Sequence, residues 1–177
     1  MKKFIHEPID IKYDDLNVIT TEKRRLYETP NGTRYPSITT ILSVNNGDFV
    51  EKWRARIGDV EADRVLHHAS TRGNALHDLA ESYLKNSLDV PNLKLMPHVK
   101  LAFNGVKRVL DEHVDRVVFQ EKALYSDFFG VAGRVDLIGY YDNELTVIDF
   151  KTSTRFKTPD QITNYFIQAS FYAAAFY

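Results

Sequence analysis

The pattern of hydrophobic and polar positions predicts mostly helices in the first two thirds of the chain. Apolar residues recur with the helical period from about residue 50 to residue 85, with a break expected near 70–73, and again over 98–113. Within the clearer part of the first segment, His77 and Glu81 fall one turn apart on the edge of the apolar stripe. We therefore expect these two polar side chains to border a cleft.

A short hairpin and a short helix are predicted before these helices. Residues 30–32 contain the Asn-Gly dipeptide, the strongest short hairpin signal, with strand-like residues on both sides. The hydroxyl of Ser37 is then available to cap a helix that runs through Leu42. Both elements are expected to extend the N-terminal side of the fold.

The pattern changes to strands after residue 113. A last helix is expected from Pro159 to the end of the sequence, because Thr158 and Gln161 complete a capping pattern around that proline. The order of helices, an antiparallel meander and a final helix indicates an α+β fold within the broad α/β class. The three strands, rich in Val, Ile, Phe and Tyr, are expected at 116–126, 131–141 and 144–152.

Turn geometry predicts which carboxylates meet in this meander. If Asp142 and Asn143 form a two-residue turn, the antiparallel ladder pairs Asp136 with Asp149. The same rule applied to the preceding turn places Glu121 opposite Asp136. Three carboxylates are therefore expected in one row of the sheet.

This row of acids predicts a metal site. Directly opposed like charges destabilise a sheet unless a counter-charge neutralises them. Carboxylate oxygens are the ligands that Mg²⁺ and Mn²⁺ prefer, and His77 could add a nitrogen ligand from the neighbouring helix. Lys151 lies two residues after Asp149, so both side chains point to the same face of the strand.

Composition excludes several other classes of protein. The 177 residues include 23 Lys+Arg and 24 Asp+Glu, for a formal net charge of −1, and no Cys, so a disulfide framework, a thiolate zinc site and a cysteine-ligated iron-sulfur cluster are ruled out. The longest apolar run, 171–177, is too short to span a membrane. We expect one soluble, cytoplasmic domain over residues 1–177, with an extension at 1–50 and the core at 51–177, and any nucleic-acid contact must use a local surface.

Five motifs occur in a fixed order along the chain. They are 35–42, Arg72-Gly73-Asn74-Ala75-Leu76-His77, Gly133-Arg134-Val135-Asp136, Val147-Ile148-Asp149-Phe150-Lys151-Thr152 and Gln168-Ala169-Ser170-Phe171-Tyr172. An Asp-x-Lys triplet alone is weak evidence, whereas ordered motifs are strong. Together these motifs resemble the RecB-like branch of the PD-(D/E)XK nuclease superfamily, and the first resembles a segment of phage exonucleases related to the mitochondrial genome maintenance exonuclease.

The resemblance implies a restriction-endonuclease-like α-β-β-β-α-β core, extended at its N-terminus by the hairpin and helices. It also implies cleavage of DNA phosphodiester bonds with one or two Mg²⁺ (or Mn²⁺) ions. In that family a further strand follows the Gln-x-x-x-Tyr helix, whereas this sequence stops at Tyr177 inside an apolar run. Either the native chain continues beyond this sequence or the core is closed differently, and we favour a shortened chain that lacks the last core strand.

The resemblance also suggests roles for individual residues. Lys151 would orient or deprotonate the attacking water, although a metal-bound hydroxide could equally be the base. Gln168 and Tyr172 would contact DNA or, alternatively, only pack their helix. The full set is Asp136, Asp149 and Lys151 as catalytic residues; His77, Asp136, Asp149 and the carbonyl of Phe150 as metal ligands; Glu121 and Glu81 as auxiliary residues; and Gln168, Tyr172, Arg72 and Thr152 as DNA contacts.

The leading hypothesis is a DNA exonuclease that acts from free ends of single-stranded DNA in phage or bacterial replication, recombination or repair. A structure-selective or flap endonuclease would use the same metal site. A silent DNA-binding module would be expected to lack an acid or the lysine, and here Asp136, Asp149 and Lys151 are all present. A nuclease subunit that needs a replication or recombination partner is the remaining alternative, and a phage-encoded protein would act in the cytoplasm of its host.

Overall fold

The chain divides into two compact units, each built from segments that are distant in sequence. The structure is a computed structural model that describes residues 2–11, 13, 15–21, 24–44, 47–89 and 93–177. The described residues within 1–9, 64–121 and 136–154 belong to unit 1, and those within 10–63, 122–135 and 155–177 belong to unit 2.

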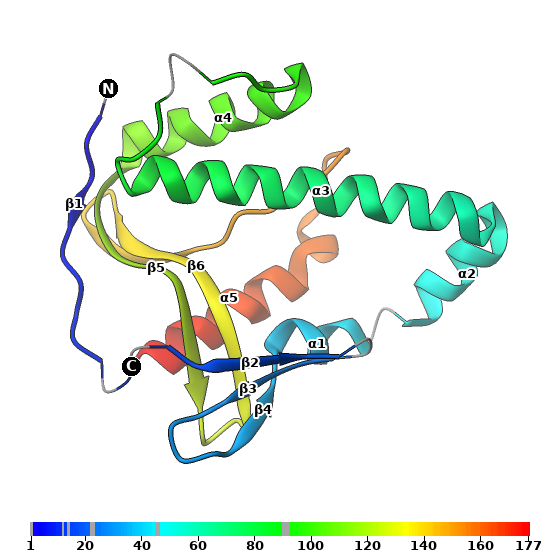
Figure 1. The fold of residues 1–177 in the computed structure, drawn as a ribbon, viewed down its shortest axis with the longest axis horizontal. Helices are drawn as coiled ribbons and strands as arrows, with labels where there is room; N and C mark the ends of the chain where they lie inside the picture. The colour runs from blue at the N-terminus through cyan, green and yellow to red at the C-terminus, as the bar shows by residue number, and fades with distance from the viewer. Residues whose placement is uncertain (1, 12, 14, 22–23, 45–46, 90–92) are drawn as a thin grey trace. The chain divides into compact units, whose positions relative to one another are not determined.

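The elements follow the order that the sequence predicts, with strands added at the N-terminus (Figure 1). They are β1 (Ile5–His6), β2 (Asn17–Thr20), β3 (Arg25–Glu28), β4 (Arg34–Pro36), α1 (Ile38–Val44), α2 (Gly47–Ile57), α3 (Asp59–Leu84), α4 (Pro97–His113), β5 (Val114–Ser126), β6 (Val131–Tyr141), β7 (Glu144–Ile148), η2 (Pro159–Ile162) and α5 (Thr163–Phe176).

Two sheets organise these strands. The larger sheet has the order β1-β5-β6-β7 and is mixed, because β1 runs parallel to β5 while β6 and β7 are antiparallel. The smaller sheet, in unit 2, has the order β2-β3-β4 and is antiparallel. This mixed α/β architecture confirms the predicted fold class and is consistent with a PD-(D/E)XK core.

The core of unit 1 packs helices α3 and α4 together with strands of the larger sheet. Tyr83 of α3 makes edge-to-face contacts with Phe4 at 5.3 Å and with Phe103 of α4 at 5.8 Å between ring centroids. Leu110, Val117 and Leu137 belong to the same buried cluster, and Ile148 and Phe150 pack against it. Burying these side chains fixes the segment that carries the candidate site.

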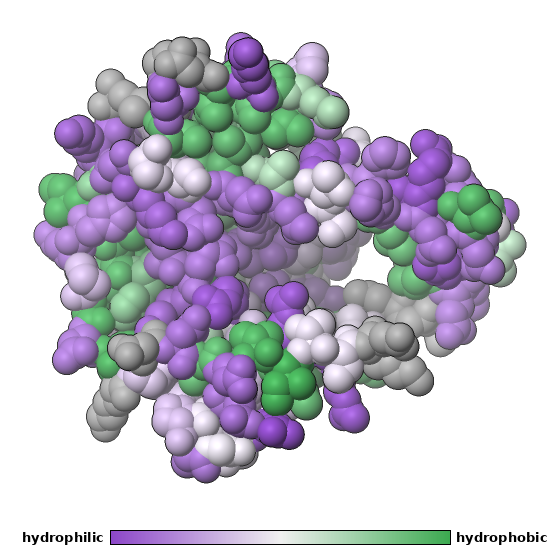
Figure 2. Space-filling view, viewed as in Figure 1, coloured by the Kyte–Doolittle hydropathy of each residue, from purple (hydrophilic) through white to green (hydrophobic). Residues whose placement is uncertain are grey.

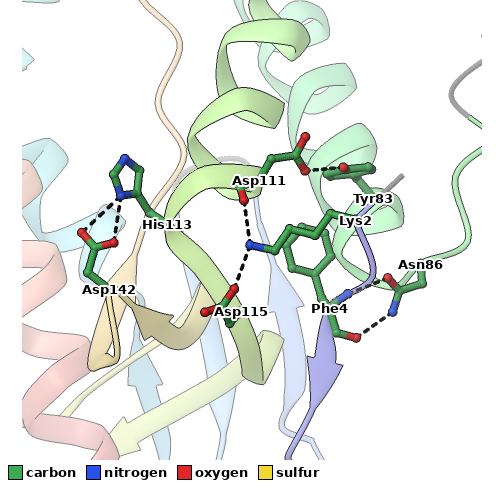
Figure 3. Close-up of polar contacts among 8 residues, drawn as sticks. All are labelled: Lys2, Phe4, Tyr83, Asn86, Asp111, His113, Asp115 and Asp142. Atoms are coloured by element: carbon green, nitrogen blue, oxygen red, sulfur yellow. Dashed lines mark hydrogen bonds and ion pairs between the residues drawn. The ribbon is translucent and has the colours of Figure 1, made fainter.

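The N-terminal segment joins unit 1, which no pattern in the sequence predicts. Phe4 is buried, and its backbone N–H and C=O exchange hydrogen bonds of 2.9 Å with the side-chain amide of Asn86 (Figure 3). Lys2 donates to the carbonyl of Asp111 at 2.7 Å and pairs with Asp115 at 2.8 Å. These contacts hold β1 beside β5 as an outer strand of the larger sheet.

The helix break lies elsewhere than predicted. Helix α3 runs without interruption through the expected break at 70–73. The chain breaks instead at Gly58, whose positive φ of 84° and N–H···O bond of 2.8 Å to Arg54 are typical of a left-handed helix cap. Gly73 has no such φ, and a Cβ there would make only an ordinary 3.6 Å contact with the hydroxyl oxygen of Thr152, so this glycine does not break the helix.

The strands and turns of the meander match the prediction closely. The second predicted strand agrees at both ends, and the first starts two residues earlier at Val114. The third ends at Ile148 rather than at residue 152, because the backbone N–H of Phe150 donates to a side chain instead of to the ladder. Thr158 and Gln161 form the predicted capping box, although the first turn of that final segment is a 3₁₀ helix.

Unit 2 contains the predicted N-terminal hairpin and helix. Strands β3 and β4 flank the turn at 30–32, and Gly32 adopts a positive φ of 82°. The hydroxyl of Ser37 accepts the N–H of Thr40 at 3.0 Å, which is the predicted cap, and α1 continues to Val44, beyond the expected Leu42. Within this unit α1 packs against α5.

Candidate metal centre

The β6–β7 hairpin sets the geometry of the candidate centre. Asp142 and Asn143 form the predicted two-residue turn, with positive φ values of 50° and 69° that suit a tight hairpin. The ladder pairs Leu137 with Ile148, so the next position along the two chains places Asp136 across from Asp149. The predicted register of this hairpin is therefore confirmed.

Glu121 reaches the same place through an unusual backbone. It lies inside β5 but has a positive φ of 48°, a left-handed conformation that is costly for a residue with a Cβ. Ligand atoms of Glu121, Asp136 and His77 all lie within 4.8 Å of one another. The carboxylate of Glu121, which was predicted to lie opposite Asp136, therefore lies beside both Asp136 and His77.

His77 is oriented by a backbone carbonyl. Its Nε2 lies 2.7 Å from the carbonyl oxygen of Phe150, which can only accept, so Nε2 carries a proton and donates. In the neutral ring, Nδ1 is then the nitrogen with a free lone pair, and it lies 3.6 Å from Oδ1 of Asp136. The carbonyl of Phe150, predicted as a metal ligand, serves here as the partner that fixes the tautomer of His77.

Negative charge and hydrogen-bond acceptors gather at the centre. Burial, followed by the nearby carboxylate of Asp149, raises the pKa of Asp136 above its ordinary value of 3.8. Oδ1 of Asp149 is buried and has no hydrogen-bond partner among the residues that the structure describes. Oδ1 of Asp136 also lies 3.6 Å from Nδ1 of His77. A divalent cation fits this set, because it would neutralise the acids and satisfy the acceptors.

Lys151 is paired with Asp149. Its ammonium forms an ion pair with Oδ2 of Asp149, whose side chain is only 10% exposed. The lysine side chain itself is 33% exposed, so it can reach a bound substrate. Asp149 therefore links the lysine to the acidic cluster, and the backbone N–H of Phe150 extends the link with a 2.7 Å hydrogen bond to Oδ2 of Asp136.

Part of the chain is similar to a known nuclease family. Residues 102–177 match the PD-(D/E)XK nuclease superfamily. The matched segment starts in α4 and includes Asp136, Asp149 and Lys151, whereas His77 lies before it. No curated protein matches the chain. None of the described helices has both the length and the apolar character that crossing a bilayer requires.

Three further residues of unit 1 were predicted to act at the site, and the structure gives the contacts or burial of each. Glu81 forms an ion pair with Lys85, and its backbone carbonyl accepts a 3.2 Å hydrogen bond from the side chain of Gln120. Arg72 is half-buried in α3. Thr152 lies close to α3, because a Cβ added to Gly73 would be 3.6 Å from its hydroxyl oxygen.

Gln168 and Tyr172 are both buried within unit 2. The side-chain amide of Gln168 donates a 3.2 Å hydrogen bond to the hydroxyl of Tyr172, which is 1% exposed. A Cβ on Gly133 would lie 2.8 Å from the ring of Tyr172, so the glycine of the Gly-Arg-Val-Asp motif makes room for that ring. This arrangement accounts for helix packing, and a direct DNA contact by either residue stays a prediction.

Apolar residues around the centre are the part that sequence reasoning missed. Val109 of α4 and Tyr141 of β6 line a pocket together with Asp149 and Lys151. Both lie in patterns typical of ordinary helix and strand packing, so no local signal distinguishes them from core residues.

Proposed function

We propose that the protein is a Mg²⁺- or Mn²⁺-dependent DNA exonuclease that hydrolyses phosphodiester bonds at free ends of single-stranded DNA. The observation that supports this most is the convergence of His77, Glu121 and Asp136 next to an Asp149–Lys151 pair. The similarity of residues 102–177 to the PD-(D/E)XK nuclease superfamily supports a nucleic-acid substrate. The preference for free ends rests on the resemblance of the motifs to RecB-like exonucleases.

Each residue has a role that follows from its contacts. His77, Glu121 and Asp136 would hold the ion, with Asp149 as a further oxygen ligand through its unpaired Oδ1. When bound, the ion supplies positive charge for the phosphoryl oxygens and lowers the pKa of a water ligand. The carbonyl of Phe150 keeps Nδ1 of His77 directed at Asp136.

Lys151 would act on the water and the phosphate. Asp149 pairs with its Nζ, and an ammonium held beside that carboxylate would donate to an attacking water or to a nonbridging phosphate oxygen. Such placement orients the nucleophile and offsets negative charge in the transition state. Arg72 and Thr152, close by in α3 and after β7, would bind the DNA backbone.

The test is cleavage of end-labelled linear single-stranded DNA beside circular single-stranded DNA and a linear RNA of the same sequence. Each is incubated with Mg²⁺ or with EDTA, using wild type, Lys151→Ala and Lys107→Ala. Lys107 is a matched control, because it also pairs with a neighbouring carboxylate, Asp111, but lies outside the centre.

We expect loss of linear DNA only, in Mg²⁺ only, with a rate about 10²- to 10⁴-fold lower for Lys151→Ala and nearly unchanged for Lys107→Ala. Cleavage of the circle would make the protein an endonuclease with the same centre. Equal activity of Lys151→Ala and wild type would overturn the assignment of the lysine, and binding without cleavage by any variant would favour a silent module or a missing partner.

A further inference from the structure

An apolar pocket of about 310 Å³ adjoins the candidate centre in unit 1. Asp149, Phe150 and Lys151 form part of its lining, and Val106, Val109 and Tyr141 are among the residues that complete it. The pocket therefore borders the segment that carries Asp149 and Lys151. Hydrophobic residues also gather on the surface over α4 (Figure 2).

We propose that this pocket binds the base of the nucleotide whose phosphate is cleaved. The proposal rests on the proposed nuclease function. A phosphate next to Lys151 is joined through one sugar to its base, so the base of that nucleotide is the apolar group that must lie nearest to the centre. The volume is at the lower end of the roughly 300–1,000 Å³ seen for ligand pockets, which suits a single nucleoside rather than a longer segment.

The walls of the pocket suit a nucleobase. Tyr141 supplies an aromatic surface, and its ring is stacked on His113 with centroids 4.7 Å apart and planes 10° from parallel. His113 is held in turn by a 2.9 Å hydrogen bond between its Nδ1 and the carboxylate of Asp142 (Figure 3). The aromatic wall is therefore fixed before a ligand arrives, which lowers the entropic cost of stacking a base.

The lining also indicates how selective the pocket is. Side chains of Val, Leu, Ile and Tyr dominate it, and its charged members, Asp149 and Lys151, belong to the catalytic segment. Stacking on apolar and aromatic walls tolerates every base, because every base has a π-face. The structure thus favours binding of any base without reading the sequence, as an enzyme that degrades a strand stepwise requires.

The first experiment compares strands that differ by one base. Linear oligonucleotides carry a single abasic residue at successive positions from each end, and kcat/KM is measured for wild type, Val109→Trp and Leu101→Trp. Val109 is 41% exposed and lines the pocket, so an indole there fills it; Leu101 is 76% exposed on the same helix outside the pocket and is the matched control.

We expect wild type and Leu101→Trp to lose about tenfold in kcat/KM when the abasic residue occupies one fixed position relative to the cleaved bond. Val109→Trp should cleave normal and abasic strands equally slowly. Cleavage that never depends on the abasic position, or a position effect that persists in Val109→Trp, would overturn the base pocket while leaving the nuclease function intact.

A binding measurement keeps the proposal testable if no strand is cleaved. Titration calorimetry in Ca²⁺ compares 2′-deoxyadenosine 5′-monophosphate with 2-deoxyribose 5-phosphate, which lacks the base. We expect the nucleotide to bind about tenfold more tightly to wild type and to Leu101→Trp, and this advantage to disappear in Val109→Trp. Equal affinities for both compounds, or a wild-type dimer that Val109→Trp dissociates, would assign the pocket to another occupant and overturn the proposal.

Discussion

At the scale of single residues, Glu121 combines a functional position with an unfavourable backbone. Its φ of 48° places a residue with a Cβ in the left-handed region, which costs about 1–2 kcal/mol and is more typical of glycine. Strained residues of this kind cluster at functional sites. In this strained conformation the carboxylate of Glu121 lies beside His77 and Asp136.

This strain can be measured with two variants that both lack the carboxylate. Glu121→Gly should be more stable than Glu121→Ala by roughly 0.5–1 kcal/mol, because the relief of the left-handed conformation exceeds the entropy that glycine adds to the unfolded chain. Urea unfolding in EDTA gives both free energies. An alanine variant that is the more stable of the two would contradict the left-handed backbone at this position.

Asp136 gives a prediction about pH. Burial and the neighbouring Asp149 raise its pKa in the folded protein above 3.8, so the native state holds a proton more tightly than the unfolded chain. Its contribution to metal-free stability is therefore full below the unfolded pKa and is lost as the pH rises through the raised native pKa. Asp136→Asn cannot titrate and serves as the reference.

The measurement is the free energy of unfolding of wild type and Asp136→Asn in EDTA at several pH values from about 3.5 upward. We expect stability of wild type to fall relative to Asp136→Asn as the pH rises, which is the opposite of the behaviour of an acid held by a salt bridge. A difference that stays constant, or that grows in favour of wild type, would show that the carboxyl has no raised pKa.

At the scale of elements, the contact between Gly133 and Tyr172 decides what the Gln-x-x-x-Tyr helix does in unit 2. Gly133→Ala should cost about 1–3 kcal/mol of stability, because its Cβ would lie 2.8 Å from the ring of Tyr172 and 3.0 Å from a methyl group of Ile38. Replacing the ring in Tyr172→Leu should remove part of that cost, so the double variant should lose less than the two single losses added together.

A double-mutant cycle by urea unfolding tests this coupling, and DNA binding by the same variants tests the alternative role. Additive losses in stability would mean that the glycine and the ring do not share space. If Tyr172→Leu weakens DNA binding at full stability while Gly133→Ala does not, the ring contacts DNA rather than serving only to pack α5.

The elements differ in how well the sequence predicts them, and the range of the deciding contacts explains why. The β6–β7 register follows from Asp142 and Asn143 alone, since a two-residue turn sets the whole ladder. The predicted helix break is wrong because Gly73 has the residue type of a breaker but not the backbone, whereas Gly58 has both. Strand β1 has two residues and depends on partners in β5 more than a hundred positions away, so no local pattern predicts it.

The candidate centre is likewise predictable where local turn geometry decides it and not where distant contacts decide it. Side chains on paired strands follow from register, which is how Asp136, Asp149 and Glu121 are expected in one row. The bond between His77 and the carbonyl of Phe150 and the left-handed φ of Glu121 are tertiary features that no spacing reveals. The contacts among the candidate ligands therefore require the structure, whereas the proximity of the carboxylates follows largely from register.

At the scale of the whole molecule, metal binding should be linked to the stability of the fold. A cation that binds the native centre and not the unfolded chain stabilises the protein by about 2.7 kcal/mol at a concentration one hundred times its Kd. For a chain of this size that corresponds to a rise in Tm of roughly 5–10 °C. The cation would also offset the repulsion between Asp136 and Asp149 in the metal-free protein.

Thermal unfolding with Mg²⁺, Mn²⁺ or EDTA tests this link in wild type, His77→Ala, Glu121→Gln and Lys151→Met. The metal-dependent rise in Tm should shrink strongly in the first two variants, because each loses a ligand of the cluster. Lys151→Met should keep the rise while losing cleavage, because the ammonium pairs with Asp149 and does not hold the ion. A rise that survives in all variants would move the metal to another part of the chain, and a rise that is lost in Lys151→Met would mean that the lysine builds the centre rather than acting on the substrate.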